Sequence, residues 1–111
     1  MDLDDVAVDF PELTLILAHA GRPLWMETAV HLARRHRNVH LDLSGIPPKS
    51  LLEYLPKLES LAAKCLFGTD WPSPGVRSIA ENVAAFLELP LTDSAKARIL
   101  AGNADALFPV R

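Results

Sequence analysis

Three short apolar runs of the chain each end in side chains that can do acid–base chemistry. The first run ends in His19, the second in Asp42 and Ser44, and the third in Asp70. A neutral imidazole can polarise a substrate or shuttle a proton, and a carboxylate can accept one. If the runs are strands, these groups emerge where the strands end. We therefore expect an α/β framework with a site at one edge of its sheet.

The elements that would position these groups alternate between strand and helix. The apolar runs predict strands over residues 13–18, 38–43 and 64–68. Apolar residues at helical spacing predict helices over residues 24–36, 50–63 and 76–87, with further helical segments over 3–10, 92–102 and 103–108. Pro56 should divide the 50–63 segment into two short helices, because proline removes a backbone donor and clashes with the preceding turn.

This alternation favours a parallel sheet with right-handed crossovers. Strands lying side by side in sequence order place every helix on one face of the sheet, which is how barrels are wound. The second strand alternates between an apolar face and a polar face, as expected near the mouth of a barrel, whereas the first strand is expected to be buried on both faces. The predicted fold class is α/β, a partial TIM barrel of three parallel strands with helices packed on one face.

Length, charge and composition exclude several classes of protein. The chain has 111 residues, which predicts a single domain over residues 1–111. A net charge of −3 gives no electrostatic support for binding nucleic acid or an anionic membrane. No apolar run approaches the ~18–20 residues of a membrane span. The acidic N-terminus lacks the pattern of a signal peptide, and the single cysteine favours a reducing cytoplasm without a disulfide.

The same patterns predict which side chains are buried. Cys65 lies inside a strand pattern and should be a small buried residue rather than a reactive thiol. His31 and His36, on the helix over residues 24–36, should be solvated. The helix over residues 76–87 should turn four apolar side chains inward, namely Ile79, Val83, Phe86 and Leu87.

Four stretches of the sequence resemble one family. They are residues 11–21 with Ala-His-Ala-Gly, 38–45 with Asp-Leu-Ser-Gly, 66–72 with Gly-Thr-Asp-Trp-Pro, and 99–108. They resemble the amidohydrolase-2 branch of the amidohydrolase superfamily, metal-dependent TIM-barrel hydrolases and decarboxylases related to aminocarboxymuconate semialdehyde decarboxylase. The resemblance covers the C-terminal third of such an enzyme. It implies barrel strands six to eight, with His19 ending strand six, Ser44 just past strand seven and Asp70 ending strand eight.

The resemblance also implies a site. A divalent metal, zinc or manganese, would be bound by Asp70 and His19. Asp70 would accept the proton of an attacking water, and His19 would polarise the substrate or shuttle the proton. Arg22 and Trp71, just beyond two strand ends, are expected to contact a small-molecule substrate, the guanidinium by binding a carboxylate and the ring by stacking. Asp42 is expected to orient a neighbouring group.

Simpler interpretations stand beside these. Asp70 could serve only to form a turn or cap a helix before Trp71, and His19 could be bonded only to backbone. The family's His-x-His pair and its strand-five histidine are missing from this sequence. The predicted function is therefore a metal-dependent hydrolase or non-oxidative decarboxylase, present here as an N-terminally truncated C-terminal portion. The alternative is a non-catalytic α/β remnant, or an oligomerising module, that has lost the metal site.

A partial barrel also predicts self-association. Without the other strands, an inner face including Leu15, Leu17 and Leu66 would be open to water, together with two unpaired sheet edges. Exposed apolar patches are uncommon on monomers, and open edges pair readily with another chain. We therefore expect a homodimer or a higher oligomer.

Overall fold

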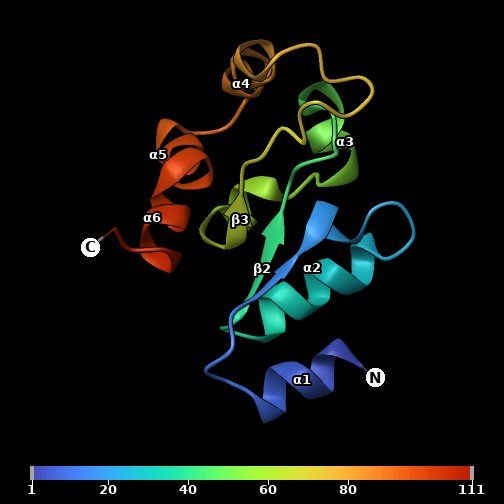
Figure 1. The fold of residues 1–111 in the computed structure, drawn as a ribbon, viewed down its shortest axis with the longest axis vertical. Coiled ribbons are helices and arrows are strands. Elements are labelled where there is room, and N and C mark those ends of the chain that lie inside the picture. Colours follow the sequence, from blue (N-terminus) through green and yellow to red (C-terminus); the bar gives the residue numbers. More distant parts are fainter. Residues whose placement is uncertain (1, 111) are drawn as a thin grey trace.

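A computed structural model describes residues 2–110 and contains one sheet of three parallel strands (Figure 1). The strands are β1 (Leu15–Leu17), β2 (Val39–Asp42) and β3 (Cys65–Leu66), paired in that order. The predicted parallel pairing and strand order are confirmed. Each strand is shorter than the apolar run that predicted it.

Helices follow each strand, as the sequence predicts. Their bounds are α1 (Leu3–Asp9), α2 (Met26–Arg35), α3 (Leu51–Tyr54), α4 (Ile79–Leu87), α5 (Asp93–Ala97) and α6 (Asn103–Leu107). Shorter turns are η1 (Ala18–Gly21), η2 (Pro48–Ser50), η3 (Leu58–Lys64) and the π-helical η4 (Arg98–Gly102). Pro56 separates α3 from η3, which confirms the predicted division. Thr92 caps α5 by accepting a hydrogen bond from the Ala95 N–H at 3.1 Å.

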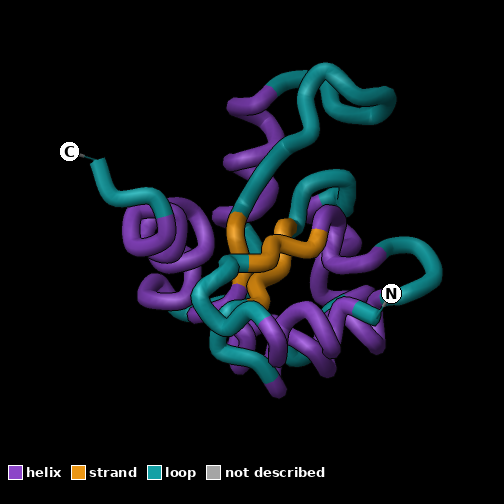
Figure 2. Tube along the Cα trace, turned by 60° about the horizontal axis from the view of Figure 1, so that its bottom comes forward, coloured by secondary structure: helices purple, strands orange, loops and turns teal. Residues whose placement is uncertain are grey.

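One face of the sheet is the core. Val39 and Leu41 of β2 are buried on this face, and Cys65 of β3 lies in register with Leu41. α2 and η3 contact β2, and η4 contacts β3, so helical segments cover this face. Figure 2 shows the strands at the centre, with helices gathered below and beside them. Cys65 is buried as predicted, and burial raises the pKa of its thiol to about 12.

The side chains of β1 do not lie on the faces of the sheet that the sequence predicted. Parallel register pairs Leu15 with Val39 and Leu17 with Leu41, so both leucines belong to the core face. Their predicted position on an open inner face is therefore wrong. Ile16 points the other way and is 36% exposed, so β1 is not buried on both faces as predicted. Leu66, in register with Asp42, is only 9% exposed, so the prediction that it lies open to water is also wrong.

Burial along the helices also corrects two predictions. Of the four α4 side chains expected to point inward, only Phe86 is fully buried; Ile79 is 52% and Leu87 47% exposed. α4 lies at one end of the molecule, away from the sheet, which leaves much of its surface open to solvent (Figure 1). His36 is not solvated, because its Nε2 lies 2.5 Å from the Asp4 carboxylate and joins α1 to α2. This hydrogen bond, together with nearby Arg35, holds the pKa of Asp4 below its usual range.

Polar side chains tie the elements of the sheet together. The Lys64 ammonium donates to the carbonyl oxygens of His36, Arg37 and Val39 at 2.7–3.0 Å, which fixes the start of β2 beside β3. Burial lowers the pKa of this lysine. Asn103 of α6 donates to the carbonyls of Ala62 and Cys65 at 2.6 and 2.7 Å. Within residues 2–110, no helix has the length and apolar character needed to cross a membrane.

Candidate functional site at the carboxyl edge of the sheet

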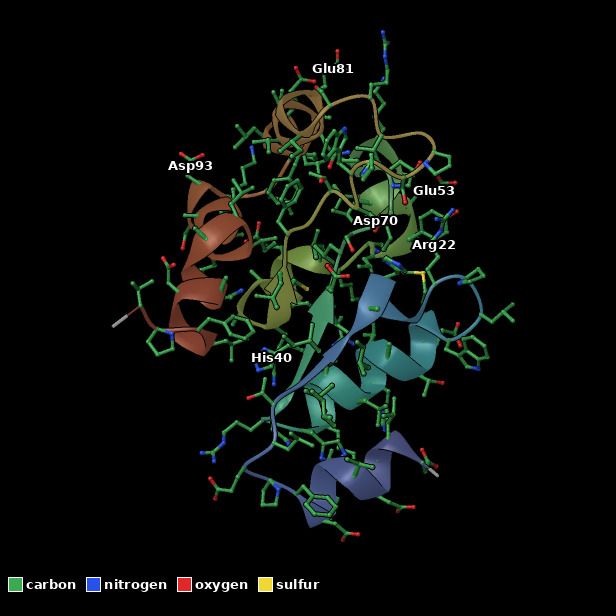
Figure 3. The ribbon with its side chains drawn as sticks, viewed as in Figure 1. Arg22, His40, Glu53, Asp70, Glu81 and Asp93 are labelled. Carbon is green, nitrogen blue, oxygen red and sulfur yellow. The ribbon has the colours of Figure 1, made fainter. Side chains whose placement is uncertain are left out.

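The candidate side chains lie in the segments that leave the carboxyl ends of the strands. His19 is in η1, directly after β1; Asp42 is the last residue of β2; and Asp70 follows β3 by four residues. In Figure 3, Asp70 and Arg22 lie near each other beyond these strand ends, whereas His40 is at the opposite end of β2. The structure therefore places the predicted groups at one edge of the sheet, where parallel α/β folds carry their sites.

The ring of His19 is held by the segment that follows β2. Its Nδ1 lies 2.6 Å from the Ser44 carbonyl oxygen and 3.2 Å from the Ser44 Oγ. Its backbone N–H donates to Asp42 Oδ2 at 3.1 Å, so Asp42 orients a neighbouring group, as predicted. The backbone bonding proposed as the simpler role of His19 is thus present. It occupies only one ring nitrogen, and the side chain remains 41% exposed.

Backbone strain gathers at the same two segments. Among the described residues, the non-glycine residues with positive φ are His19 (55°), Ala20 (50°) and Asp70 (61°). A left-handed conformation is uncommon for such residues, and each instance costs on the order of 1–3 kcal/mol. For His19 this conformation ends the strand alternation of β1, because its φ and ψ of 55° and 25° are not those of a strand. Residues in such conformations cluster at functional sites, which favours a functional role for this edge.

Asp70 forms a turn and still presents its carboxylate. Its Oδ2 accepts a hydrogen bond from the Ser73 hydroxyl at 2.9 Å, and its carbonyl accepts from the Ser73 N–H at 2.8 Å. The turn-forming role is therefore real. Asp70 is nevertheless exposed, so its carboxylate remains accessible to a ligand. Sequence reasoning missed Ser73, although an aspartate followed by a Pro-Ser-Pro-Gly stretch is a recognisable turn signal.

Arg22 joins Asp70 in the lining of a cavity of about 770 Å³. Its Nη1 donates to the Gly45 carbonyl at 2.7 Å, and its guanidinium carbon lies 5.2 Å from the centre of the Tyr54 ring. The volume is within the ~300–1,000 Å³ of small-molecule sites. Thr69, the loop after Asp70 and the start of α4 form another wall, which includes Ser73, Ser78, Glu81 and Asn82.

Two predicted site residues do not line this cavity. Trp71 is 54% exposed and is absent from the lining, so the structure gives no support to its predicted contact with a substrate there. His19 is also absent from the lining, but Gly45, which packs against its ring, belongs to it. The cavity wall formed by α4 and the Tyr54 ring beside Arg22 were missed from the sequence, because neither carries a local motif.

The family resemblance implies a metal ion, which requires several ligand side chains close together. Within the described residues there is no group of three or more His, Cys, Asp or Glu side chains that could hold a metal ion. Asp70 and His19 therefore do not complete a metal centre by themselves. What this edge supplies is an accessible carboxylate, an imidazole with one nitrogen unoccupied by its neighbours, and a guanidinium. These groups can transfer protons and bind an anion.

Known proteins match this chain in fold. An uncharacterised TIM-barrel protein from Bordetella bronchiseptica superposes with a TM-score of 0.76 and 32% identity over 95% of this chain. The 5-carboxyvanillate decarboxylase LigW from Sphingomonas paucimobilis superposes with a TM-score of 0.68 and 21% identity over 98% of this chain. This chain spans 37% of the length of each. No curated protein matches it in sequence.

A family model described as amidohydrolase matches residues 1–110. This confirms the family that the sequence motifs resemble, and the structural matches confirm that the three strands and their helices are part of a TIM barrel. The chain belongs to the amidohydrolase family.

Proposed function

We propose that this chain forms part of the active site of a metal-dependent hydrolase or non-oxidative decarboxylase. The observation that carries the proposal is the convergence of strain and chemistry at one edge, where His19 and Asp70 both adopt left-handed backbone conformations. The decarboxylase that superposes on the chain is named for a carboxylated substrate, which supports the second reaction class. A zinc or manganese ion would need ligands in addition to Asp70.

The side chains have distinct roles in this proposal. The nitrogen of His19 that its neighbours leave unoccupied exchanges a proton with the reacting substrate. Arg22 binds a carboxylate of the small-molecule substrate, because a guanidinium held over the Tyr54 ring at the cavity wall is pre-oriented for an anion. The exposed carboxylate of Asp70 accepts a proton or contributes to holding the metal. A reducing cytoplasm suits the buried, free Cys65.

Replacing Asp70 tests the proposal. We expect Asp70→Asn to weaken zinc or manganese binding by at least ~10-fold, measured by equilibrium dialysis with metal analysis, because even supporting residues of metal sites change affinity by this much. Asp93→Asn, at an exposed aspartate of α5, is the matched control and should leave binding unchanged. His19→Asn should reduce turnover more than it reduces metal binding.

The non-catalytic alternative is favoured by one observation, the lack of three clustered metal-binding side chains in residues 2–110. The same experiment separates the two functions. Equal metal affinity of the wild type and Asp70→Asn would remove Asp70 as a ligand. No binding by the wild type after reconstitution with either metal would favour the non-catalytic module.

We also propose that two copies associate through the open face of the sheet. β1 is an outer strand with an unpaired edge, and its Ile16 is exposed, whereas the Cys65 carbonyl of β3 is bonded to Asn103. Light scattering at micromolar concentration should show a dimer or a higher oligomer. Ile16→Glu should shift it toward monomer, whereas Ile79→Glu, at a similarly exposed position on α4, should not. A wild-type monomer that binds no hydrophobic dye would contradict this.

A further inference from the structure

A chain of three polar groups leads from β2 to the ring of His19. The Ser44 hydroxyl lies 2.6 Å from Asp42 Oδ2 and 3.2 Å from His19 Nδ1. The Ser44 N–H donates to the other carboxylate oxygen, Oδ1, at 3.0 Å. Asp42 Oδ2 also accepts the His19 backbone N–H. One carboxylate therefore fixes both the turn that carries Ser44 and the turn that carries His19.

The hydrogen positions in this chain follow from the chemistry of its acceptors. A carboxylate only accepts, so the single hydrogen of the Ser44 hydroxyl points to Asp42. The hydroxyl oxygen then presents a lone pair to His19 Nδ1, and the Ser44 carbonyl presents another at 2.6 Å. Two acceptors facing Nδ1 require that this nitrogen carry the proton of the neutral ring. The other nitrogen, Nε2, is then the basic atom of the ring.

The same assignment excludes another use of these residues. A serine, a histidine and an aspartate together resemble a nucleophilic triad, in which the imidazole removes the hydroxyl proton. Here the Ser44 hydroxyl donates its hydrogen bond to Asp42, and the ring nitrogen that faces its oxygen is a donor. Ser44 is therefore not activated as a nucleophile, and its contacts serve the ring of His19.

Two glycines provide the space that this arrangement needs. A Cβ at Gly45 would lie 2.6 Å from His19 Nδ1, and one at Gly68 would lie 2.9 Å from the Ser44 Cβ and 3.2 Å from Asp42 Oδ1. Any larger residue at either position would displace part of the chain from Asp42 to His19. Gly45 thus packs against the ring itself, and Gly68 packs against Ser44 and Asp42, the two residues behind it.

We propose that Asp42 and Ser44 are positioning residues that hold His19 in the Nδ1–H tautomer and direct Nε2 toward the substrate. The part of this proposal that concerns substrate depends on the proposed function. The tautomer does not, since it follows from the hydrogen bonds alone. Neither residue touches the reacting atoms, so each acts through the orientation and tautomer of the imidazole.

The test is the tautomer of His19, measured by ¹⁵N NMR of the labelled 111-residue protein at a pH where its imidazole is neutral. We expect the ring of His19 to carry its proton on Nδ1. His31, exposed on α2, serves as an internal reference in the same spectrum. Asp42→Ala should convert the His19 signals to those of a tautomer mixture, and Ser44→Ala should do so to a lesser degree, because the backbone carbonyl remains.

Thermal unfolding of each variant establishes that it is folded, and Asp105→Ala at an exposed site of α6 is the matched control. A wild-type His19 protonated on Nε2 would overturn the proposal without any variant. A folded Asp42→Ala that retains the pure Nδ1–H tautomer would also overturn it. If His19 carries its proton on Nδ1 but Asp70→Asn leaves metal binding unchanged, the proposed role of Asp70 is refuted. The positioning of His19 by Asp42 and Ser44 then still stands.

Discussion

Phe86→Ala should lower the free energy of unfolding by about 3–5 kcal/mol, as expected for removing a large aromatic side chain from a core. Phe86 is fully buried, and its ring packs at 5.1 Å and a tilt of 51° against that of Phe67. The loss should be near the top of the range, because the other large apolar side chains of α4 are half-exposed or exposed. Nothing on this helix can replace the contact.

Leu87→Ala is the matched control, since Leu87 adjoins Phe86 on α4 but is 47% exposed. Urea unfolding should give a loss below about 1 kcal/mol for this variant. α4 supplies Glu81 and Asn82 to the cavity wall, and its N-cap residue Ser78 belongs to the same wall, so Phe86→Ala should disorder that wall. Equal losses in the two variants would show that α4 is not anchored through Phe86.

Gly45→Ala should destabilise the protein by about 2–3 kcal/mol and displace the ring of His19. Gly45 has a φ of +73°, where an alanine costs about 1–2 kcal/mol. The added Cβ would also lie 2.6 Å from His19 Nδ1, so the ring must leave the Ser44 carbonyl and lose a hydrogen bond of about 1 kcal/mol. The NMR signals of His19 should then lose the Nδ1–H pattern.

Gly75→Ala separates the two causes. Gly75 also has a positive φ, +90°, but a Cβ there would meet nothing within 4 Å. This variant should show only the backbone cost of about 1–2 kcal/mol in urea unfolding and leave the His19 signals unchanged. If Gly45→Ala behaves in the same way, the contact between Gly45 and the imidazole does not hold the ring.

The sheet could be predicted from the sequence because the patterns that define it are local and recur along the chain. Apolar runs separated by helical patterns are sufficient to define parallel strands in sequence order, and Pro56 defined a helix boundary by its own chemistry. The face of β1 was assigned incorrectly. It depends on the pairing of Leu15 with Val39, which is a property of two segments and not of one.

The sequence could indicate which side chains follow the strand ends, and it could not predict their geometry. Residues at strand ends identified His19, Arg22 and Asp70. The contacts that determine what His19 can do come from Ser44 and Gly45, 25 or more residues later in the chain. These contacts depend on left-handed backbone conformations, which no sequence pattern predicts. The burial of His36 was missed for the same reason, since its partner Asp4 lies on another helix.

The most direct test of a shared site at the carboxyl edge is paramagnetic broadening by Mn²⁺ in the ¹⁵N–¹H spectrum of the labelled protein. We expect the amide signals of His19 and Asp70 and of their neighbours to broaden first and together, and Asp70→Asn to suppress the broadening of both. Broadening confined to the acidic residues of α1, or loss of the Asp70 signal without that of His19, would contradict a common site.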